Sequence, residues 1–260
     1  MQYGLYLAAS GMLTGMHRMD VHANNLANVE TTGFKLDTPL PRQRAPEREE
    51  SGRAGMPSNK MLERLGGGVL MSRPRVSLAQ GTLQTTANAL DIAVQGEGFL
   101  VVRDGVGNGP EATAFTRDGR LTLDSTGKLV QASSGRPILD MDDRPITLVD
   151  GLPIAIDKSG TIRQGGEIVG QIQLATIENP SLLRKRGENM LAADGATMGR
   201  KRAAAGATIE QNAIERSTVD SVRSMMAFSS AERAMSGNAK MIQNYDEMMN
   251  RTINTFGKMG

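Results

Sequence analysis

Two histidines, one acidic cluster and two glycine-rich stretches have the residue types that catalysis or metal binding would need. His17 and His22 lie five residues apart, roughly 140° around a helix, so they do not share a face. The acidic run at 140–143 offers oxygens for calcium, but neither the glycine nor the distal glutamate of an EF-hand follows it. The glycines of 96–98 and 104–111 complete no nucleotide-binding motif. We therefore expect no catalytic residue, no metal and no cofactor.

The composition excludes further classes of chemistry. The chain has no cysteine, which excludes disulfide scaffolds, thiolate zinc sites and cysteine nucleophiles. Thirty basic residues against 28 acidic ones leave a net charge of +2, too small to draw the whole molecule to nucleic acid or an anionic membrane. Aromatic residues make up only 3%, so the core must rely on aliphatic side chains, alanine and the 17 methionines. A hydrolase that uses Asp or Glu is an alternative, but no pair of carboxylates is singled out.

The elements that position side chains begin with a helix over residues 3–27, whose apolar residues step by four and three in a heptad seam. Gly4, Gly11 and Gly15 lie in the same segment, and each weakens a helix by roughly 1 kcal/mol relative to alanine. We expect this helix to form only when a partner packs on its seam. The Gly11–Gly15 spacing is that of a small-residue packing motif, which we interpret as meaningful only in a membrane-spanning helix. The seam residues are Leu5, Ala9, Met12, Met16, Met19, Ala23 and Leu26.

The start of the chain lacks the features of a targeting segment. No Lys or Arg precedes the apolar run of residues 1–16, and the run is too short to cross a bilayer. We expect neither a cleaved signal peptide nor membrane insertion.

Residues 36–65 have four prolines, alternating charge and little apolar content, which predicts a flexible, solvated connector. A nucleic-acid-binding arm is the alternative, but the charges are mixed and no aromatic residue is present to stack on bases. Over 66–205, short strand-like runs alternate with glycine turns, which predicts an all-β module of sandwich or barrel type. Asp118-Gly119 and Thr126-Gly127 are hairpin signals, and further turns are expected at Asp150-Gly151, Ser159-Gly160 and Gly165-Gly166.

Residues 206–260 return to a helical pattern, with Thr218 or Asp220 as the N-terminal cap. The resulting fold class is α+β, with heptad-patterned helices in 1–35 and 206–260 and a central β module. The two apolar stripes could pair with each other, with other copies, or with both. The C-terminal stripe contains Phe228, Ala231, Met235, Asn238, Ile242, Tyr245 and Met249.

Several segments resemble the axial family of bacterial flagellar rod and hook proteins. The residues that carry the resemblance at the N-terminus are "GLYLAASGM" at 4–12 and "DVHANNLANVETTGFK" at 20–35. "ALDIAVQGEGFLVV", "FTRDGRLTLDSTGKLV" and "LLRKRGENML" are similar to the family's β domain, and "IEQNAIERSTVDSVRSMM" and "AERAMSGNAKMIQNYDEMM" to its C-terminal helix. The modest length and the segment "GRPILDMDDRPITL" favour a proximal rod subunit, with a distal rod or hook-type subunit as the alternative.

The resemblance implies a structural subunit of the periplasmic flagellar rod that passes through the flagellar export apparatus. It implies polymerisation through the terminal helices with copies of itself and with other rod and hook subunits, and no small-molecule substrate. It also implies that the segment Asn24, Asn25, Leu26, Ala27 and Asn28 ends the first helix, that Gly33 allows a sharp turn and that Phe34 anchors the connector. Because asparagine tolerates left-handed backbone, we expect these asparagines to end the helix locally.

An interaction module is the alternative from another class. In that interpretation the chain is a secreted β-domain adhesin or chaperone-binding factor with coiled-coil ends, which would form small discrete oligomers rather than enter a filament.

Overall fold

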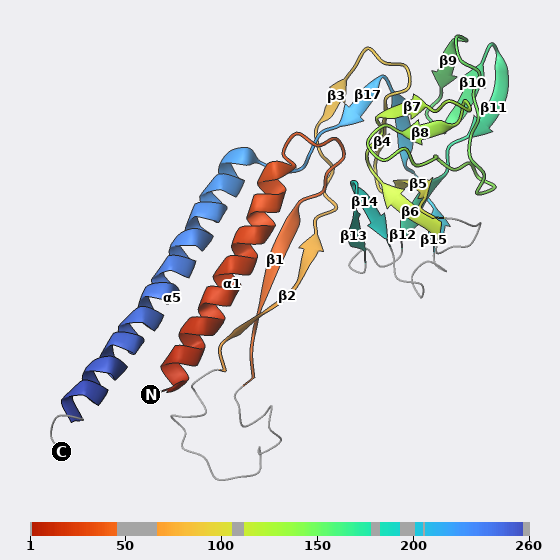
Figure 1. The fold of residues 1–260 in the computed structure, drawn as a ribbon. Coiled ribbons are helices and arrows are strands. Elements are labelled where there is room, and N and C mark those ends of the chain that lie inside the picture. Colours follow the sequence, from red (N-terminus) through yellow and green to blue (C-terminus); the bar gives the residue numbers. More distant parts are fainter. Residues whose placement is uncertain are drawn as a thin grey trace, which may run out of the picture. The chain divides into compact units, whose positions relative to one another are not determined.

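The computed structural model describes residues 2–45, 67–105, 112–177, 183–192, 201–204 and 206–256. The chain divides into two compact units (Figure 1). The helical unit comprises residues 1–27, 37–75 and 220–260, and the β unit comprises 28–36 and 76–219. Terminal helices that pack together and central sheets confirm the α+β class.

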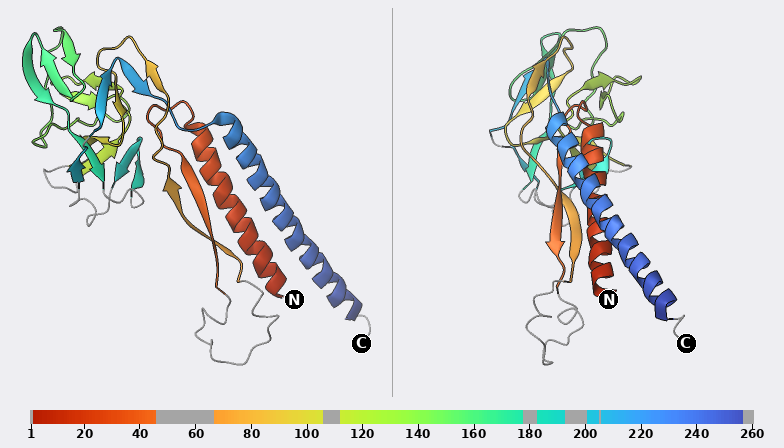
Figure 2. Two further views of the ribbon diagram at one scale, coloured as in Figure 1. Left: turned by 180° about the vertical axis from the view of Figure 1, so that it is seen from behind. Right: turned by 90° about the vertical axis from the view of Figure 1, so that its left-hand side faces the viewer.

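The helical unit contains two helices and a two-stranded sheet. Helix α1 spans Gln2–Ala27 and helix α5 spans Ser221–Phe256, while strands β1 and β2 span Asp37–Gln43 and Val69–Val76. Figures 1 and 2 show α1 between α5 on one side and the β1–β2 ribbon on the other. The Asp220 carboxylate accepts a hydrogen bond from the Arg223 amide at 3.0 Å, which confirms Asp220 as the cap of α5. At 1.5 Å per residue, α5 is about 54 Å long.

Two boundaries expected from the sequence are corrected. Strand β1 lies in the segment expected to be a flexible connector, and the remainder of that segment, 46–66, falls outside the described residues. Pro39 and Pro41 are two apart in β1, so their missing N–H groups lie on the same edge, which a two-stranded ribbon tolerates. At the other end, 208–215 form strands rather than the start of a helix, because they pair with earlier strands of the β unit.

The β unit is built around a six-stranded sheet of order β13-β14-β6-β5-β12-β15, whose adjacent strands are antiparallel. Four smaller sheets accompany it, of order β11-β10-β9, β16-β4, β17-β3 and β7-β8. The strands are β3 (Leu83–Thr85), β4 (Ile92–Gln95), β5 (Phe99–Arg103), β6 (Thr113–Thr116), β7 (Leu121–Leu123), β8 (Leu129–Gln131), β9 (Ile154–Ile156), β10 (Thr161–Gln164), β11 (Glu167–Gln171), β12 (Leu174–Ile177), β13 (Arg184–Gly187), β14 (Met190–Ala192), β15 (Lys201–Ala203), β16 (Thr208–Gln211) and β17 (Ala213–Glu215).

Both faces of the six-stranded sheet are buried. Along β5, Leu100 and Val102 belong to one hydrophobic cluster, and Phe99 and Val101 belong to another. This alternation follows from the two-residue period of a strand. The four residues are apolar without interruption because each face of the sheet has its own core.

Three of the expected turns are confirmed as hairpins. Thr126-Gly127 joins β7 to β8, Ser159-Gly160 joins β9 to β10, and Gly165-Gly166 joins β10 to β11. The hairpin expected at Asp118-Gly119 is wrong, because β6 and β7 lie in different sheets. There the Gly119 carbonyl accepts a hydrogen bond from the Ile92 amide at 2.9 Å, so this turn carries the chain from one sheet towards β4.

Candidate assembly site

The end of α1 is fixed by Asn25, whose side chain is fully buried. Its amide nitrogen donates to the Asp37 carbonyl at 2.8 Å, and its amide oxygen accepts from the Asp37 amide at 2.9 Å. Asn25 therefore imitates a paired strand residue and ties the helix to the start of β1. Helix α1 ends at Ala27, inside the expected segment, but the expected left-handed backbone is wrong, because none of the three asparagines has a positive φ. Asn24 and Ala27 are exposed, and Leu26 and Asn28 are half-buried.

The signature turn itself belongs to the β unit, where Gly33 meets both geometric conditions that require glycine. Its φ is +67°, and an added Cβ would overlap the backbone of Arg117. The Gly33 amide donates to the Glu215 carbonyl at 2.7 Å, which places the turn on β17. Phe34 is buried, with the Lys185 ammonium 3.6 Å from its ring centroid. Gly33 thus lies in a turn with left-handed backbone, and Phe34 is packed into the β unit next to it.

Beside the turn lies a buried group of charges, Lys35, Arg117 and Glu215, which we call the charge clamp. Glu215 Oε1 accepts from Lys35 Nζ at 2.6 Å, and Oε2 accepts from Arg117 Nη1 at 3.2 Å. Burial lowers the pKa of the Lys35 ammonium below its usual range, although Glu215 raises it. Burial likewise lowers the pKa of Arg117 against the opposing effect of Glu215. The sequence did not single out these residues, because Lys35 and Glu215 are 180 positions apart.

The contact between α1 and α5 is made by glycines rather than by the expected seam of α1. Added Cβ atoms would overlap Tyr245 at Gly4, crowd Asn238 at 2.8 Å at Gly11, and meet Met235 Cβ at 3.0 Å at Gly15. The glycines therefore allow close approach of the helices, and restricting this motif to membrane spans was wrong. On α5 the expected stripe does face α1. Phe228, Met235, Ile242 and Tyr245 are half-buried, whereas Met249 near the end is exposed.

The expected seam of α1 lies to one side of this contact. At about 100° per residue, Leu5, Met12, Met16 and Ala23 lie roughly 80–120° from the glycine line, and Leu13 lies roughly 180° from it. Leu5, Ala9, Met12, Met19 and Leu26 are half-buried, and Met16 and Ala23 are exposed.

The ribbon covers another side of α1, where Ser10 Oγ accepts from the Val69 amide at 3.5 Å. What remains open is the third face of α1, defined by Tyr6, Ala9, Leu13, Met16 and Ala23. Tyr6 and Leu13 are 69% and 67% exposed.

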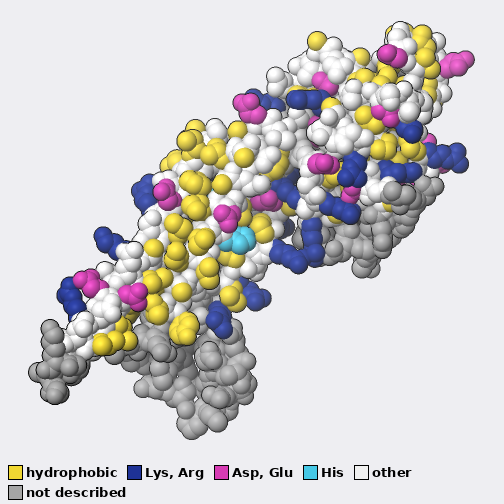
Figure 3. Space-filling model, in the orientation of Figure 1, with side chains coloured by type: hydrophobic (Ala, Val, Ile, Leu, Met, Phe, Trp, Pro, Cys, Tyr) yellow, Lys and Arg dark blue, Asp and Glu magenta, His cyan; other side chains and the backbone are white. Residues whose placement is uncertain are grey.

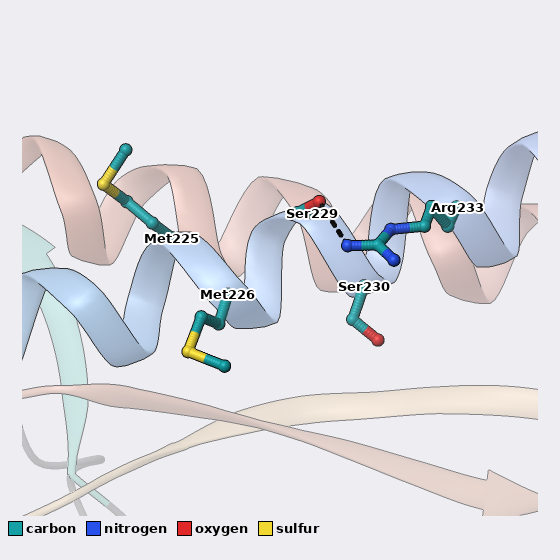
Figure 4. Close-up of a pocket in the computed structure, with 5 residues that line it drawn as sticks. All are labelled: Met225, Met226, Ser229, Ser230 and Arg233. Atoms are coloured by element: carbon teal, nitrogen blue, oxygen red, sulfur yellow. Dashed lines mark hydrogen bonds between the residues drawn. The ribbon is translucent and has the colours of Figure 1, made fainter.

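Helix α5 also leaves apolar side chains open, on the side away from the α1 contact. Val222, Met225 and Met226 form this methionine face, and Met226 is 70% exposed. The two methionines, with Ser229, Ser230 and Arg233, line a shallow cavity of about 570 Å³ (Figure 4). Arg233 donates to Ser229 Oγ at 3.2 Å, so the guanidinium is held beside the methionines. Figure 3 shows how hydrophobic side chains gather along the helices.

A smaller cavity of about 250 Å³ lies inside the helical unit. Burial and the nearby Arg18 lower the pKa of His22, so the unprotonated imidazole is favoured there. The lining residues are Arg18, His22, Pro39, Ala227, Ser230, Ala231 and Ala234.

The part of the chain that the structure describes contains no group of three or more His, Asp or Glu side chains able to hold a metal. Within the same residues, no helix combines the length and the hydrophobicity that crossing a bilayer requires. The features described above are tight packing of α1 on α5 within the helical unit, buried tethers at the signature turn within the β unit, and exposed apolar faces on α1 and α5. These are properties of a subunit that assembles.

Comparison with known proteins identifies the assembly. The model of the flagella basal body rod protein matches residues 5–35, that of the flagellar hook protein FlgE/F/G D1 domain matches 93–169, and that of the flagellar basal body rod FlgEFG protein C-terminal region matches 210–255. The flagellar basal-body rod protein FlgF of Caulobacter vibrioides is 30% identical over the full length of both chains. The chain belongs to the family of flagellar basal-body rod proteins.

Other members of the rod family are similar over nearly the same length. FlgG of Caulobacter vibrioides is 31% identical over 95% of this chain and 97% of its own, and FlgF of Mesorhizobium japonicum is 28% identical over 99% of each. The chain is therefore a structural, non-enzymatic subunit of the flagellar basal-body rod, where it assembles with rod subunits. The matched segments 5–35 and 210–255 include most of α1, nearly all of α5 and two residues of the charge clamp, Lys35 and Glu215.

Proposed function

We propose that copies of this chain polymerise by burying the third face of α1 against the methionine face of α5 in the next copy. The observation that carries the proposal is that α1 stays exposed on this face although α5 and the ribbon cover its other sides. A contiguous exposed apolar face on a soluble protein marks an interaction site. These are two different surfaces, so the contact is heterologous and suits an open helical filament.

The energy of this contact is sufficient to hold a helix that is weak alone. Tyr6, Leu13 and Met16 are 69%, 67% and 41% exposed, so burying the remaining area contributes at most about 1.5–3 kcal/mol for each side chain, from which the cost of ordering must be subtracted. The same copy presents Val222, Met225 and Met226 to its other neighbour. The expected interface residues Leu5 and Met12 lie at the edge of the third face and add to the contact. Met19 and Leu26 lie closer to the glycine line of α1, and Met249 continues the α5 stripe that faces α1.

The polymer is part of the rod that transmits motor torque, and subunits reach it through the flagellar export apparatus. Within the rod family we favour the proximal, FlgF-like position, because the similarity to a FlgF protein runs over the full length of both chains. The neighbours are then copies of this chain and other rod subunits. An epitope-tagged copy located in purified basal bodies tests the position, since a tag found only at the hook end of the rod would contradict it.

A charge on the third face tests the polymerisation. Leu13→Asp and Met16→Asp place a carboxylate on exposed positions of α1, so the folded subunit should keep its urea-unfolding midpoint. Rod assembly and swimming should be lost, because the carboxylate would be buried against the next copy. Val149→Asp is the control for Leu13→Asp, since Val149 is 63% exposed against 67% for Leu13 but lies in the β unit. Normal rods with both α1 variants would refute the interface.

A further inference from the structure

The charge clamp has an unusual balance of charges, with two cations and one carboxylate, all buried. The side chains of Lys35 and Arg117 are 2% and 4% exposed, and that of Glu215 is fully buried. Replacing a buried ion pair with apolar side chains of similar volume is often neutral or stabilising. Stability alone therefore does not account for such a group. The clamp provides hydrogen bonds that hold the side chains of Lys35, Arg117 and Glu215 in defined directions towards their partners.

Those bonds join three separate segments of the β unit. Besides Glu215 on β17, Lys35 Nζ donates to the Ala79 carbonyl at 2.7 Å. Glu215 Oε1 also accepts from the Gly81 amide at 2.6 Å. Arg117 anchors the group to the sheets through the carbonyls of Val94 and Gly96, at 3.2 and 2.6 Å.

Backbone hydrogen bonds run along the same three segments. The Ser77 amide donates to the Leu36 carbonyl at 2.7 Å, and the Thr218 amide donates to the Phe34 carbonyl at 3.1 Å. The Arg216 amide donates to the Thr82 carbonyl at 2.9 Å. The segments 33–36, 77–82 and 215–218 are thus bonded into one bundle, with the clamp at its centre.

The position of this bundle in the chain is what gives it a mechanical meaning. The chain passes between the helical unit and the β unit at four points, after Ala27, Leu36, Arg75 and Val219. The bundled segments reach or closely adjoin three of these points, and the fourth begins the signature turn that Gly33 ties to Glu215. Every covalent route between the units therefore enters the β unit through residues fastened to the bundle.

We propose that the charge clamp is the junction through which force passes between the two units. Because the clamp ties the connecting segments to one another, a pull on one of them is shared by the others and none is peeled away alone. Lys35 is the positioning residue of the junction, since its ammonium bridges the signature turn to both other segments. This inference rests on the proposed torque transmission, and it assigns a role in rod strength rather than in rod assembly.

Lys35→Met tests the junction, because it removes the ammonium, keeps the apolar stem and leaves Glu215 paired with Arg117. Hydrogen exchange in 77–82 and 215–218 should accelerate together by roughly 10- to 100-fold, the effect of one lost charged hydrogen bond. Arg136→Met is the matched control, since Arg136 pairs with Asp104 elsewhere in the β unit. Acceleration in only one segment, or equal acceleration in the control, would overturn the proposal.

The motor provides the second measurement. Cells with Lys35→Met should build rods in normal number and turn small loads, but lose rotation or break rods under high load. We expect Leu13→Asp to prevent rod assembly and Lys35→Met to leave it intact, and this difference separates the junction from the polymerisation proposal. Undiminished rotation of Lys35→Met motors at high load would refute the junction.

The wild-type protein supplies a test that needs no substitution. With increasing denaturant, the amides of 77–82 and 215–218 should open at one common free energy, as expected of one cooperative unit. Openings at clearly different denaturant concentrations would refute the junction even if Lys35→Met failed to fold.

Discussion

Alanine substitutions at Gly4 and Gly15 of α1 separate the cost of close helix packing from the gain in helix propensity. Both glycines face α5; Gly15 lies in the interior of the helix, and Gly4 lies in its first turn. In each case the substitution removes the entropic penalty of glycine, which contributes about 1 kcal/mol in favour of alanine. The two positions differ in what the new methyl group would meet.

At Gly4 the methyl group would overlap the hydroxyl end of Tyr245, which is the far end of a half-buried side chain. The ring can turn aside at little cost, so Gly4→Ala should stabilise the helical unit by up to about 1 kcal/mol. At Gly15 the methyl group would lie 3.0 Å from Cβ and 3.1 Å from Cα of Met235. Only a shift of the α5 backbone relieves this contact, and overpacking of that kind costs about 1–3 kcal/mol.

The expected difference between the two variants is therefore about 1–3 kcal/mol, with Gly4→Ala the more stable. Urea unfolding of the full-length protein, followed by the far-ultraviolet helical signal, measures it because long helices lie in the helical unit. The midpoint should rise for Gly4→Ala and stay equal or fall for Gly15→Ala. If Gly15→Ala were as stabilising as Gly4→Ala, the glycines would not be the points of closest approach and the packing described for α1 would be refuted.

Three further predictions concern other parts of the molecule. Asn25→Ala removes both bonds to the Asp37 backbone and should destabilise the helical unit by about 1–3 kcal/mol in urea titrations, and an unchanged midpoint would contradict this. The folded state lowers the pKa of His22 below 6.5, so the free energy of unfolding should fall as the pH drops through 6.5 towards the folded pKa. In His22→Gln, the melting temperature should depend less steeply on pH over this range, and an unchanged dependence would count against the cause given for the pKa shift. Limited proteolysis of the dilute protein should cut α1 and α5 before the β unit, because the helices expose apolar faces and contain glycines. Mass spectrometry of the fragments measures this, and equal protection of both units would contradict it.

The C-terminal helix shows how far apolar periodicity can lead. The steps of three and four from Phe228 to Tyr245 identified the face of α5 that packs on α1, because the large side chains on this face are half-buried there. On α1 the same rule selected Leu5, Met12 and Met16. Periodicity finds the largest apolar side chains, but the closest helix contact is made where side chains are absent. When a helix has two covered sides and one exposed apolar side, a single apolar stripe in the sequence does not predict which side contacts the neighbouring helix.

Long-range pairing explains what else the sequence did not reveal. Asn25 was expected to act locally, but its partner Asp37 lies twelve residues ahead and becomes available only once β1 forms. Lys35 and Glu215 carry no local pattern at all, because a charged residue after a turn is ordinarily solvated. The strands of β16 and β17 were assigned to a helix for the same reason, since their partners β4 and β3 are distant in the sequence.

The division of the surface of α1 links these observations to assembly. A helix weakened by Gly4, Gly11 and Gly15 needs α5 for its closest contact, and a third face carrying Tyr6 and Leu13 is unfavourable in water. Both features are disadvantages in a protein that remains alone. They become useful in a subunit that must join a filament, because the same side chains that destabilise the free helix stabilise it when the next copy covers them. In the proposed polymer, the apolar area that a single chain leaves exposed on α1 is thus the source of the contact between copies, and that contact offsets the low helix propensity of the glycines.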